Sequence, residues 1–334
     1  VPFNGRRMLE CYAEGARRFG WSERSAVPGS RRDGEHLIGI GMAAAIRMHF
    51  QGATQATVRV EGDGRVVVRS DMTDIGTGTY TILGQVAADA LGVPFDMVRV
   101  ELARTGLPPS PGSGGSWGAA NSSNAVHRAC EAIKTQVFGD ARAPASTPPG
   151  LTAEVARRFP QGVEGSGSIV GMANDPNYKS YSQHTYGASF AEVAVSAVTG
   201  EVRLRRMLGV FACGRIINPK TARSQVIGGM IWGVSTALLE AAHVDPRHGH
   251  VVNGDLAEYV MPVHADIPAI EAVLLDDFDD KANPLGMKGV GEIGVCGTGA
   301  AVANAVFNAT GVRVTDFPIT PDKLLAALPD AAGL

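Results

Sequence analysis

The feature that most constrains the fold is a repeated order of short elements: a β-hairpin, a glycine turn, an amphipathic helix and a strand. Two β-rich runs at 56–60 and 65–69 flank Gly62-Asp63-Gly64, which is a hairpin turn signal. Apolar residues at helical spacing follow over 79–91, and a strand is expected at 97–102. Strands that pair locally with helices between them predict an α+β fold, with mixed sheets and packed helices, rather than a doubly wound parallel sheet.

The same kinds of element recur through the rest of the chain, after a stretch at 140–150 that is rich in proline, alanine and glycine. We therefore expect a first subdomain at 1–140, a connecting stretch at 141–160, and a second subdomain at 161–334. Further elements are predicted as helices near 8–19, 122–137, 220–240, 298–309 and 321–328, and as strands near 165–171, 187–196, 201–210 and 269–275.

Composition excludes several classes of partner. The 334 residues are 45% hydrophobic and carry a formal net charge of −3, and their Lys and Arg residues are dispersed, so no nucleic-acid or membrane-surface footprint is present. The sequence has no apolar run of about 20 residues and no signal peptide, which leaves the compartment open between cytoplasm and periplasm. The four cysteines are far apart, so buried thiols are expected rather than a zinc or iron-sulfur site.

Two glycine-rich loops precede predicted helices and are candidate cofactor contacts. In the first, the amides of Gly76, Thr77 and Gly78 can receive an anionic group at a helix N-terminus, although a plain tight turn explains them equally well. It is no dinucleotide fingerprint, because the third glycine is missing, so NAD is disfavoured. The second loop can be a ligand cradle or a flexible linker, and Trp117 within it argues against a linker. Its candidate residues are Ser113, Gly114, Gly115, Ser116 and Gly118.

Two more segments nearer the C-terminus are candidates. The helix carrying Gln225 contains glycines at 228, 229 and 233, each of which costs about 1 kcal/mol against alanine. Close helix packing on that face explains these glycines, and so does a hydrogen bond from Gln225 to a cofactor whose bulk requires small neighbours; the two explanations are compatible. The run Lys288-Gly289-Val290-Gly291-Glu292 places one carboxylate between flexible glycines, just before a helix. Glu292 is therefore either a catalytic base presented to a cofactor or a solvated loop acid.

The last of these runs, continuing through Cys296-Gly297-Thr298-Gly299 to Pro318-Ile319-Thr320-Pro321, resembles the end of the molybdenum-binding large subunit of xanthine dehydrogenases and aldehyde oxidases. All four loops follow this family's order at comparable spacing over 39–328, and Tyr186–Val193 and Gly214–Pro219 resemble its strand and strand-exit signatures. Thr77 stands where many relatives carry glutamine. The Glu-Ile-Gly-Val-Cys-Gly-Thr-Gly run is most similar to the bacterial periplasmic-type aldehyde oxidoreductase large subunit.

The resemblance implies a function and a cofactor. It implies a molybdenum–molybdopterin cofactor in the cytosine dinucleotide form, surrounded by the four loops and without a direct protein ligand to the metal. It implies oxidation of aldehydes to carboxylic acids with oxygen from water, with Glu292 as the base for a molybdenum-bound hydroxyl. Hydroxylation of purines or other N-heterocycles by the same chemistry is the alternative substrate class.

The resemblance also implies partners. The family's large subunit is about twice as long, and the chain opens on Val1, so we expect it to be the C-terminal half, completed by an N-terminal half. Electrons would leave through a 2Fe-2S subunit and an FAD subunit, consistent with the lack of cysteine clusters and dinucleotide motifs. A non-catalytic fragment or assembly module is the remaining alternative.

Overall fold

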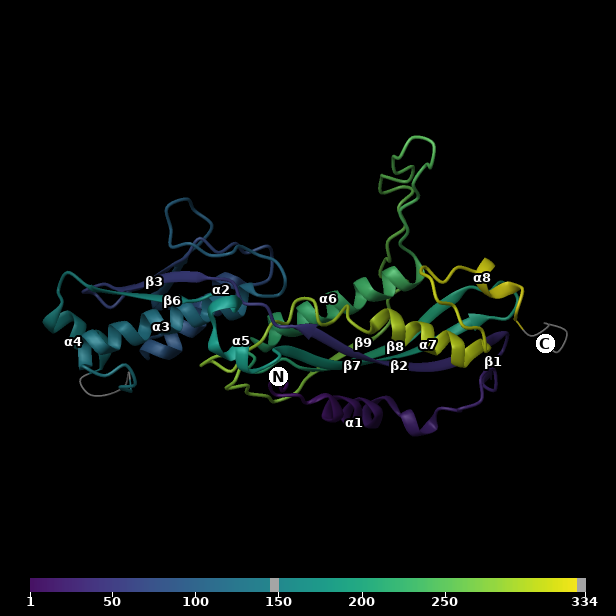
Figure 1. Cartoon of the computed structure of the whole chain (residues 1–334), viewed down its shortest axis with the longest axis horizontal. Helices are drawn as coiled ribbons and strands as arrows, with labels where there is room; N and C mark the ends of the chain where they lie inside the picture. The colour runs from purple at the N-terminus through teal and green to yellow at the C-terminus, as the bar shows by residue number, and fades with distance from the viewer. Residues whose placement is uncertain (145–149, 329–334) are drawn as a thin grey trace.

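The protein consists of two lobes that lie along the long axis of the molecule, each a β-sheet with helices packed on it (Figure 1). The structure, a computed structural model, describes residues 1–144 and 150–328. The helices are α1 (Met8–Phe19), α2 (Thr79–Leu91), α3 (Gly118–Phe138), α4 (Leu151–Arg158), α5 (Pro176–Ser180), α6 (Pro219–Leu238), α7 (Thr298–Thr310) and α8 (Asp322–Leu325). The strands are β1 (Arg32–Asp33), β2 (His36–Met48), β3 (Thr54–Val60), β4 (Val66–Arg69), β5 (Val98–Glu101), β6 (Val163–Ile169), β7 (His184–Ser196), β8 (Val202–Ala212) and β9 (Ile270–Leu274). Within this part of the chain, no helix has both the length and the hydropathy needed to cross a membrane.

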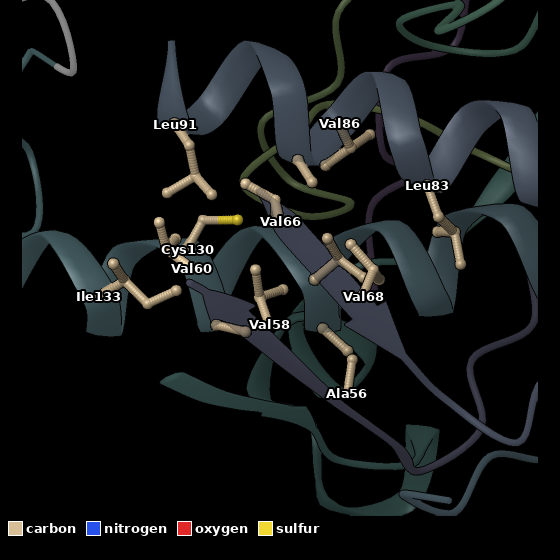
Figure 2. Packing of buried hydrophobic residues seen from close by; sticks show 14 of the residues in the cluster. Ala56, Val58, Val60, Val66, Val68, Leu83, Val86, Leu91, Cys130 and Ile133 are labelled. Atoms are coloured by element: carbon tan, nitrogen blue, oxygen red, sulfur yellow. The ribbon is translucent and has the colours of Figure 1, made fainter. Parts of the chain in front are cut away.

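The smaller sheet has the strand order β5-β4-β3-β6, with β5 parallel to β4 and the other pairs antiparallel. Side chains alternate between buried and more exposed along β3 and β6, so one face forms the core and the other meets solvent. Helices α2 and α3 cover the core face, where valines of β3 and β4 meet Leu83, Val86 and Ile133 (Figure 2). Gly165 and Gly167 let α3 approach, because a Cβ at either would lie within 2.3 Å of a helix carbonyl oxygen.

The larger sheet has the order β1-β2-β7-β8-β9 and is covered on both faces. Helix α1 lies on one face, and α6 and α7 lie on the other (Figure 1). Strand β7 is buried almost throughout, as expected for a central strand between two helical layers. It pairs with β2 in unbroken register from His36 opposite Ser196 to Met48 opposite His184. This pairing brings the end of β2 to the junction of the two lobes.

The lobes confirm the predicted α+β class but do not coincide with the predicted subdomains. Strand β2, from the first subdomain, pairs with β7 from the second, and α3 packs on β6 across the expected connecting stretch. Part of that stretch, 145–149, lies outside the described residues, and 151–158 forms α4. The smaller lobe is therefore an insertion between β2 and β7, a long-range arrangement that local patterns do not encode.

Three of the four cysteines are packing groups, as expected from their spacing. Cys11, Cys130 and Cys213 are buried, and burial raises the pKa of each thiol to about 12. Cys296 is only half-buried, and its thiol donates to the carbonyl oxygen of Glu292 at 3.4 Å. A thiol with so high a pKa stays protonated, which suits it to packing rather than to metal binding.

Candidate functional site

A cavity of about 290 Å³ lies at the junction of the two lobes and brings the four predicted loops together. Gly76, Gly78 and Gly289 belong to these loops without lining the cavity. The remaining predicted residues all line it: Thr77, Ser113, Gly114, Gly115, Ser116, Gly118, Gln225, Lys288, Val290, Gly291 and Glu292. Residues separated by more than 200 positions in sequence therefore share one concave surface, which is the usual form of a small-molecule site.

Glu292 presents its carboxylate at this cavity with one oxygen bound and the other free. Its Oε2 accepts a hydrogen bond from the Ser116 hydroxyl at 3.2 Å and one from Arg47 Nε at 3.0 Å, and Arg47 Nη2 also contacts it. Oε1 accepts no hydrogen bond from the residues that the structure describes. The Glu292 side chain is 37% exposed and lines the cavity.

Ser116 ties the Glu292 loop to the smaller lobe. Its hydroxyl accepts the Glu292 backbone N–H at 2.8 Å while donating to the same residue's carboxylate. Ser116 adopts a φ of 61°, a left-handed conformation that is uncommon for a residue other than glycine. Gly289 is required here, because a Cβ at that position would lie 2.6 Å from the Ser116 carbonyl oxygen.

Arg47, near the end of β2, and His49, which directly follows that strand, were both missed by the sequence analysis. The Arg47 guanidinium lies over the Phe50 ring at 4.7 Å, which directs it toward Glu292. His49 Nδ1 accepts the Gly289 N–H at 3.2 Å, while its Nε2 has no partner within residues 1–144 and 150–328. Burial and then the nearby Lys288 charge lower the pKa of His49 to about 4, so it is a neutral acceptor. No local motif marks either residue.

Lys288 anchors the 288–292 loop through buried ion pairs. Its side chain is fully buried, and its ammonium group lies 3.1 Å from Asp279 Oδ2 and 3.6 Å from Asp277 Oδ2. Asp279 also accepts from the Asn4 side chain and the Gly5 N–H, so the start of the chain joins the same network. The predicted cofactor contact Lys288 therefore lines the cavity while its charge is neutralised by two aspartates.

The 74–78 loop is bonded differently from the prediction. Asp74 accepts the N–H groups of Gly76 at 2.9 Å, of Gly78 at 3.2 Å and of Tyr80 at 3.2 Å. Although burial opposes it, these backbone donors keep the pKa of Asp74 below its ordinary value. The amides of Gly76 and Gly78 are therefore capped by their own loop, and Thr77 is the residue of this turn that lines the cavity.

The 113–118 loop, by contrast, is closed by its side chains and leaves main-chain donors free. Trp117 Nε1 donates to the Gly112 carbonyl at 2.8 Å, and the Ser113 hydroxyl donates to the Thr73 carbonyl at 2.8 Å. Within the described chain, the N–H groups of Gly114, Gly115 and Ser116 donate to no internal acceptor. These bonds exclude the flexible-linker interpretation and leave a row of amide donors beside the cavity.

The three glycines of α6, at 228, 229 and 233, differ in what surrounds them. A Cβ at Gly229 would lie 3.0 Å from Gly294, and one at Gly233 would lie 2.5 Å from Thr298, so these two glycines serve close packing. Gly228 has open space around it. Gln225 lines the cavity, and its side-chain amide has no hydrogen-bond partner in the described residues. It is therefore available to a ligand.

The chain is similar to known molybdopterin-binding proteins. The family model described as "Molybdopterin cofactor-binding domain" matches residues 14–268. The chain is 47% identical over 340 residues to the aldehyde oxidoreductase molybdenum-binding subunit PaoC of Escherichia coli, covering 98% of this chain and 46% of that protein. It is 32% identical to the probable hypoxanthine oxidase XdhD of Escherichia coli, covering 86% of this chain and 32% of that protein. The aldehyde oxidoreductase of Desulfovibrio desulfuricans superposes with a TM-score of 0.73 at 26% identity, covering 96% of this chain and 34% of that one.

These matches cover only part of each relative. The chain spans about half the length of the PaoC relative and about a third of the XdhD relative. The donors beside the cavity are main-chain amides, hydroxyls, the carboxamides of Asn218 and Gln225, and the Arg215 guanidinium, while the Lys288 ammonium is paired with aspartates. The single Asp-His-His group in the described residues lies elsewhere, at Asp245, His248 and His250. Such a donor set fits an acceptor-rich, anionic group that carries its own metal, rather than a bare metal ion.

Proposed function

The chain belongs to the molybdopterin-binding family of xanthine dehydrogenases and aldehyde oxidases, and on this premise we propose that it is part of a molybdenum hydroxylase subunit that oxidises aldehydes to carboxylic acids. The observation that carries the proposal is the Glu292 carboxylate at the cavity, with one oxygen tethered and the other free. The 47% identity to an aldehyde oxidoreductase subunit supports the substrate class.

The residues around the cavity fit molybdopterin. Its pterin and phosphate groups are rich in acceptors, and the free N–H groups at Gly114, Gly115 and Ser116, with the Gln225 carboxamide, are matching donors. Gly291 has no side chain to fill the space between Ser116 and Gln225. A Cβ at this position would lie 3.4 Å from Ser116 Oγ and 3.6 Å from Gln225 Oε1. When bound, the group supplies a redox-active, Lewis-acidic metal.

Glu292 is proposed as the base. The conversion of an aldehyde and water to a carboxylic acid releases two electrons and two protons, so the oxygen that attacks the carbonyl carbon must lose a proton. Glu292 Oε1 is free to accept it, while Ser116 and Arg47 hold Oε2 and fix the orientation of the carboxylate.

A dinucleotide form of the cofactor is proposed because a second cavity adjoins the first, and cytosine as its base follows the family resemblance alone. Arg215 and Ile217 line both cavities, and the second, of about 660 Å³, is also lined by Gln85, Asp89 and His127. Arg215 and Asp89 form an ion pair at 3.3 Å. These polar groups offer donors and acceptors to a nucleotide beyond the pterin.

The proposed partners rest on the family and on the names of relatives, which include a molybdenum-binding subunit of an aldehyde oxidoreductase and the gamma subunit of a dehydrogenase complex. The four cysteines of this chain, Cys11, Cys130, Cys213 and Cys296, form no cluster in the described residues. Electrons would pass to 2Fe-2S and FAD groups on other subunits. The rest of the molybdenum subunit, an iron-sulfur subunit and a flavin subunit are the proposed assembly.

A second candidate function, hydroxylation of purines or other N-heterocycles, is favoured by the 32% identity to a probable hypoxanthine oxidase. The two substrates are separated by kcat/KM for benzaldehyde and for hypoxanthine in the complete assembly, with molybdenum and pterin measured on the same sample. We expect about one molybdenum per complex and a higher kcat/KM for benzaldehyde. A well-folded complex without molybdenum would favour the non-catalytic assembly module instead.

A further inference from the structure

An arm formed by residues 239–269 leaves the end of α6, projects away from both sheets and contains a tight turn at 245–250 (Figure 1). The Asp245 N–H donates to the His250 carbonyl at 2.9 Å, and the Gly249 N–H donates to the Asp245 carbonyl at 2.8 Å. A β-bridge joins the two residues that flank the turn. Main-chain bonds therefore give this turn a fixed shape.

The turn brings one carboxylate and two imidazoles together. The possible ligand atoms of Asp245, His248 and His250 all lie within 4.8 Å of one another. His248 Nδ1 lies 3.1 Å from Asp245 Oδ2, and the centroids of the two imidazole rings are 5.9 Å apart. Imidazole nitrogen and carboxylate oxygen are ligands that zinc and neighbouring divalent transition metals accept.

The spacing of these atoms is close to that of a tetrahedral zinc site. With bonds of about 2.0–2.1 Å to the metal, neighbouring ligand atoms lie roughly 3.3 Å apart. The 3.1 Å between His248 Nδ1 and Asp245 Oδ2 already matches this spacing. His250 must approach by no more than about 1.5 Å, the difference between 4.8 Å and the ideal spacing. The His250 side chain is exposed, so a rotation of its ring can supply that movement.

Asp245 is already oriented and ionised. Its side chain is largely buried, and its Oδ1 accepts the Arg247 backbone N–H at 2.8 Å. Hydrogen bonds from the Arg247 side chain and then from His248 lower the pKa of Asp245 to about 2. The carboxylate is therefore a charged ligand at neutral pH, held in place before any metal binds.

Arg247 is the group that competes with a metal ion at this turn. Its Nη2 lies 3.0 Å from Asp245 Oδ2, and its positive charge opposes a nearby cation. The Arg247 side chain is 79% exposed, and ion pairs at such exposure contribute little to stability. The guanidinium can therefore turn into solvent when a metal takes its place, and removing it should favour the metal.

We propose that Asp245, His248 and His250 bind one divalent transition-metal ion of the zinc class, with water completing its coordination. Two nitrogen ligands disfavour Mg²⁺ and Ca²⁺, which prefer oxygen. The ion would join the two sides of the turn and stiffen the arm. The site is distinct from the cavity, whose lining includes none of the arm residues, so the inference does not depend on the proposed function.

The test is zinc binding to the complete assembly, purified without a histidine tag and dialysed against micromolar Zn²⁺, with zinc and molybdenum measured by mass spectrometry. We expect the wild type to hold about one zinc per chain more than the variant that combines His248→Gln with His250→Gln. His264→Gln is the matched control, because His264 is exposed on the same arm and joins no metal-ligand group in the described chain. It should bind zinc like the wild type.

Two further measurements separate a built site from a chance cluster. Arg247→Gln should strengthen zinc binding by roughly twofold to fivefold, because a competing exposed ion pair is removed. Hydrogen exchange over 245–250 should slow when Zn²⁺ is added to the wild type and should not change in the double histidine variant. Molybdenum content should be the same in every variant, since none of these residues lines the cavity.

Several results would overturn the inference. Equal zinc in the wild type and the double histidine variant, or no zinc in either, would show that the turn binds no metal. Weaker binding in Arg247→Gln would show that Arg247 does not compete for Asp245. Displacement of the zinc by excess Mg²⁺ would contradict the ligand set, and unchanged hydrogen exchange in the wild type would place the zinc elsewhere.

Discussion

The 74–78 and 288–292 loops are alike in sequence, since each combines glycines with one carboxylate before a helix, yet they bind their main-chain donors in opposite ways. In the first loop, Asp74 itself accepts the N–H groups of Gly76 and Gly78. In the second, distant residues accept them, because His49 takes the Gly289 N–H and Ser116 takes the Glu292 N–H. The loop tethered from outside leaves one oxygen of its own carboxylate, Glu292 Oε1, free for chemistry, whereas both oxygens of Asp74 cap its own loop.

Replacing the carboxylate of the tethered loop tests this contrast with the largest expected effect. Glu292→Gln keeps the size of the side chain and removes its capacity to accept a proton. We expect turnover per bound molybdenum to fall by roughly 100-fold to 10,000-fold, with molybdenum content unchanged. Steady-state aldehyde oxidation alongside metal analysis provides the measurement. Near-normal turnover would remove Glu292 as the base.

His49, which accepts the Gly289 N–H of the tethered loop, makes the free energy of unfolding depend on pH. Because the pKa of His49 falls from 6.5 to about 4 on folding, the unfolded chain binds the extra proton between those pH values. The stability that comes from keeping His49 neutral is fully present above about pH 6.5. It is lost as the pH falls to about 4, which lowers the free energy of unfolding by up to about 3 kcal/mol. Denaturant unfolding across this pH range measures it.

Two variants of His49 separate its effect on the pH dependence of unfolding from that of carboxylates that titrate in the same pH range. His49→Asn retains an acceptor near Nδ1 without a titrating group, so its unfolding free energy should depend less on pH while turnover is retained. His49→Leu removes the acceptor and should lower kcat as well. Equal pH dependence in the wild type and in His49→Asn would show that His49 titrates normally.

The hydroxyl that tethers Glu292 is the next test. Ser116→Ala keeps the strained backbone position but removes both the acceptor for the Glu292 N–H and the donor to its carboxylate. We expect kcat to fall about tenfold with little change in KM, as expected for the loss of one positioning hydrogen bond. Ser166→Ala, on the exposed face of β6, is the control. A change in KM alone would assign Ser116 to substrate binding.

The self-capped loop predicts the smallest effect. Asp74→Ala leaves three backbone donors without their acceptor, at a cost of about 1–2 kcal/mol in unfolding free energy. Turnover per bound molybdenum should change by less than about twofold, because Asp74 carries no step of the reaction. Thermal unfolding and the same aldehyde assay report the two quantities. A loss of turnover with unchanged stability would contradict the contrast between the loops.

Local patterns predicted most elements because hydrophobic periodicity and turn residues are written into short windows. The prediction for α2 matches its observed bounds, 79–91, and the prediction for α6 differs by two residues or fewer at each end. The expected helix at 122–137 begins earlier, at Gly118, since the loop closed by Trp117 turns directly into α3. The final helix is shorter than expected, at Asp322–Leu325.

The site was predictable only in part. Family-like motifs marked Glu292, Gln225 and the glycine loops, and the structure brings them to one cavity. Arg47 and His49 were missed because each acts through a partner about 240 residues away, at the end of a strand whose pairing with β7 is set by the whole fold. The capping role of Asp74 was missed because the same sequence pattern, a carboxylate before glycines, occurs in loops that cap themselves and in loops that face a ligand.

Turnover per bound molybdenum, measured side by side for Glu292→Gln and Asp74→Ala in the complete enzyme, tests the central claim most directly. The account predicts that both variants bind molybdenum, that Glu292→Gln loses at least about 100-fold in turnover, and that Asp74→Ala stays within about twofold of the wild type. Comparable losses in the two variants, or none in Glu292→Gln, would contradict the assignment of the tethered loop as the catalytic one.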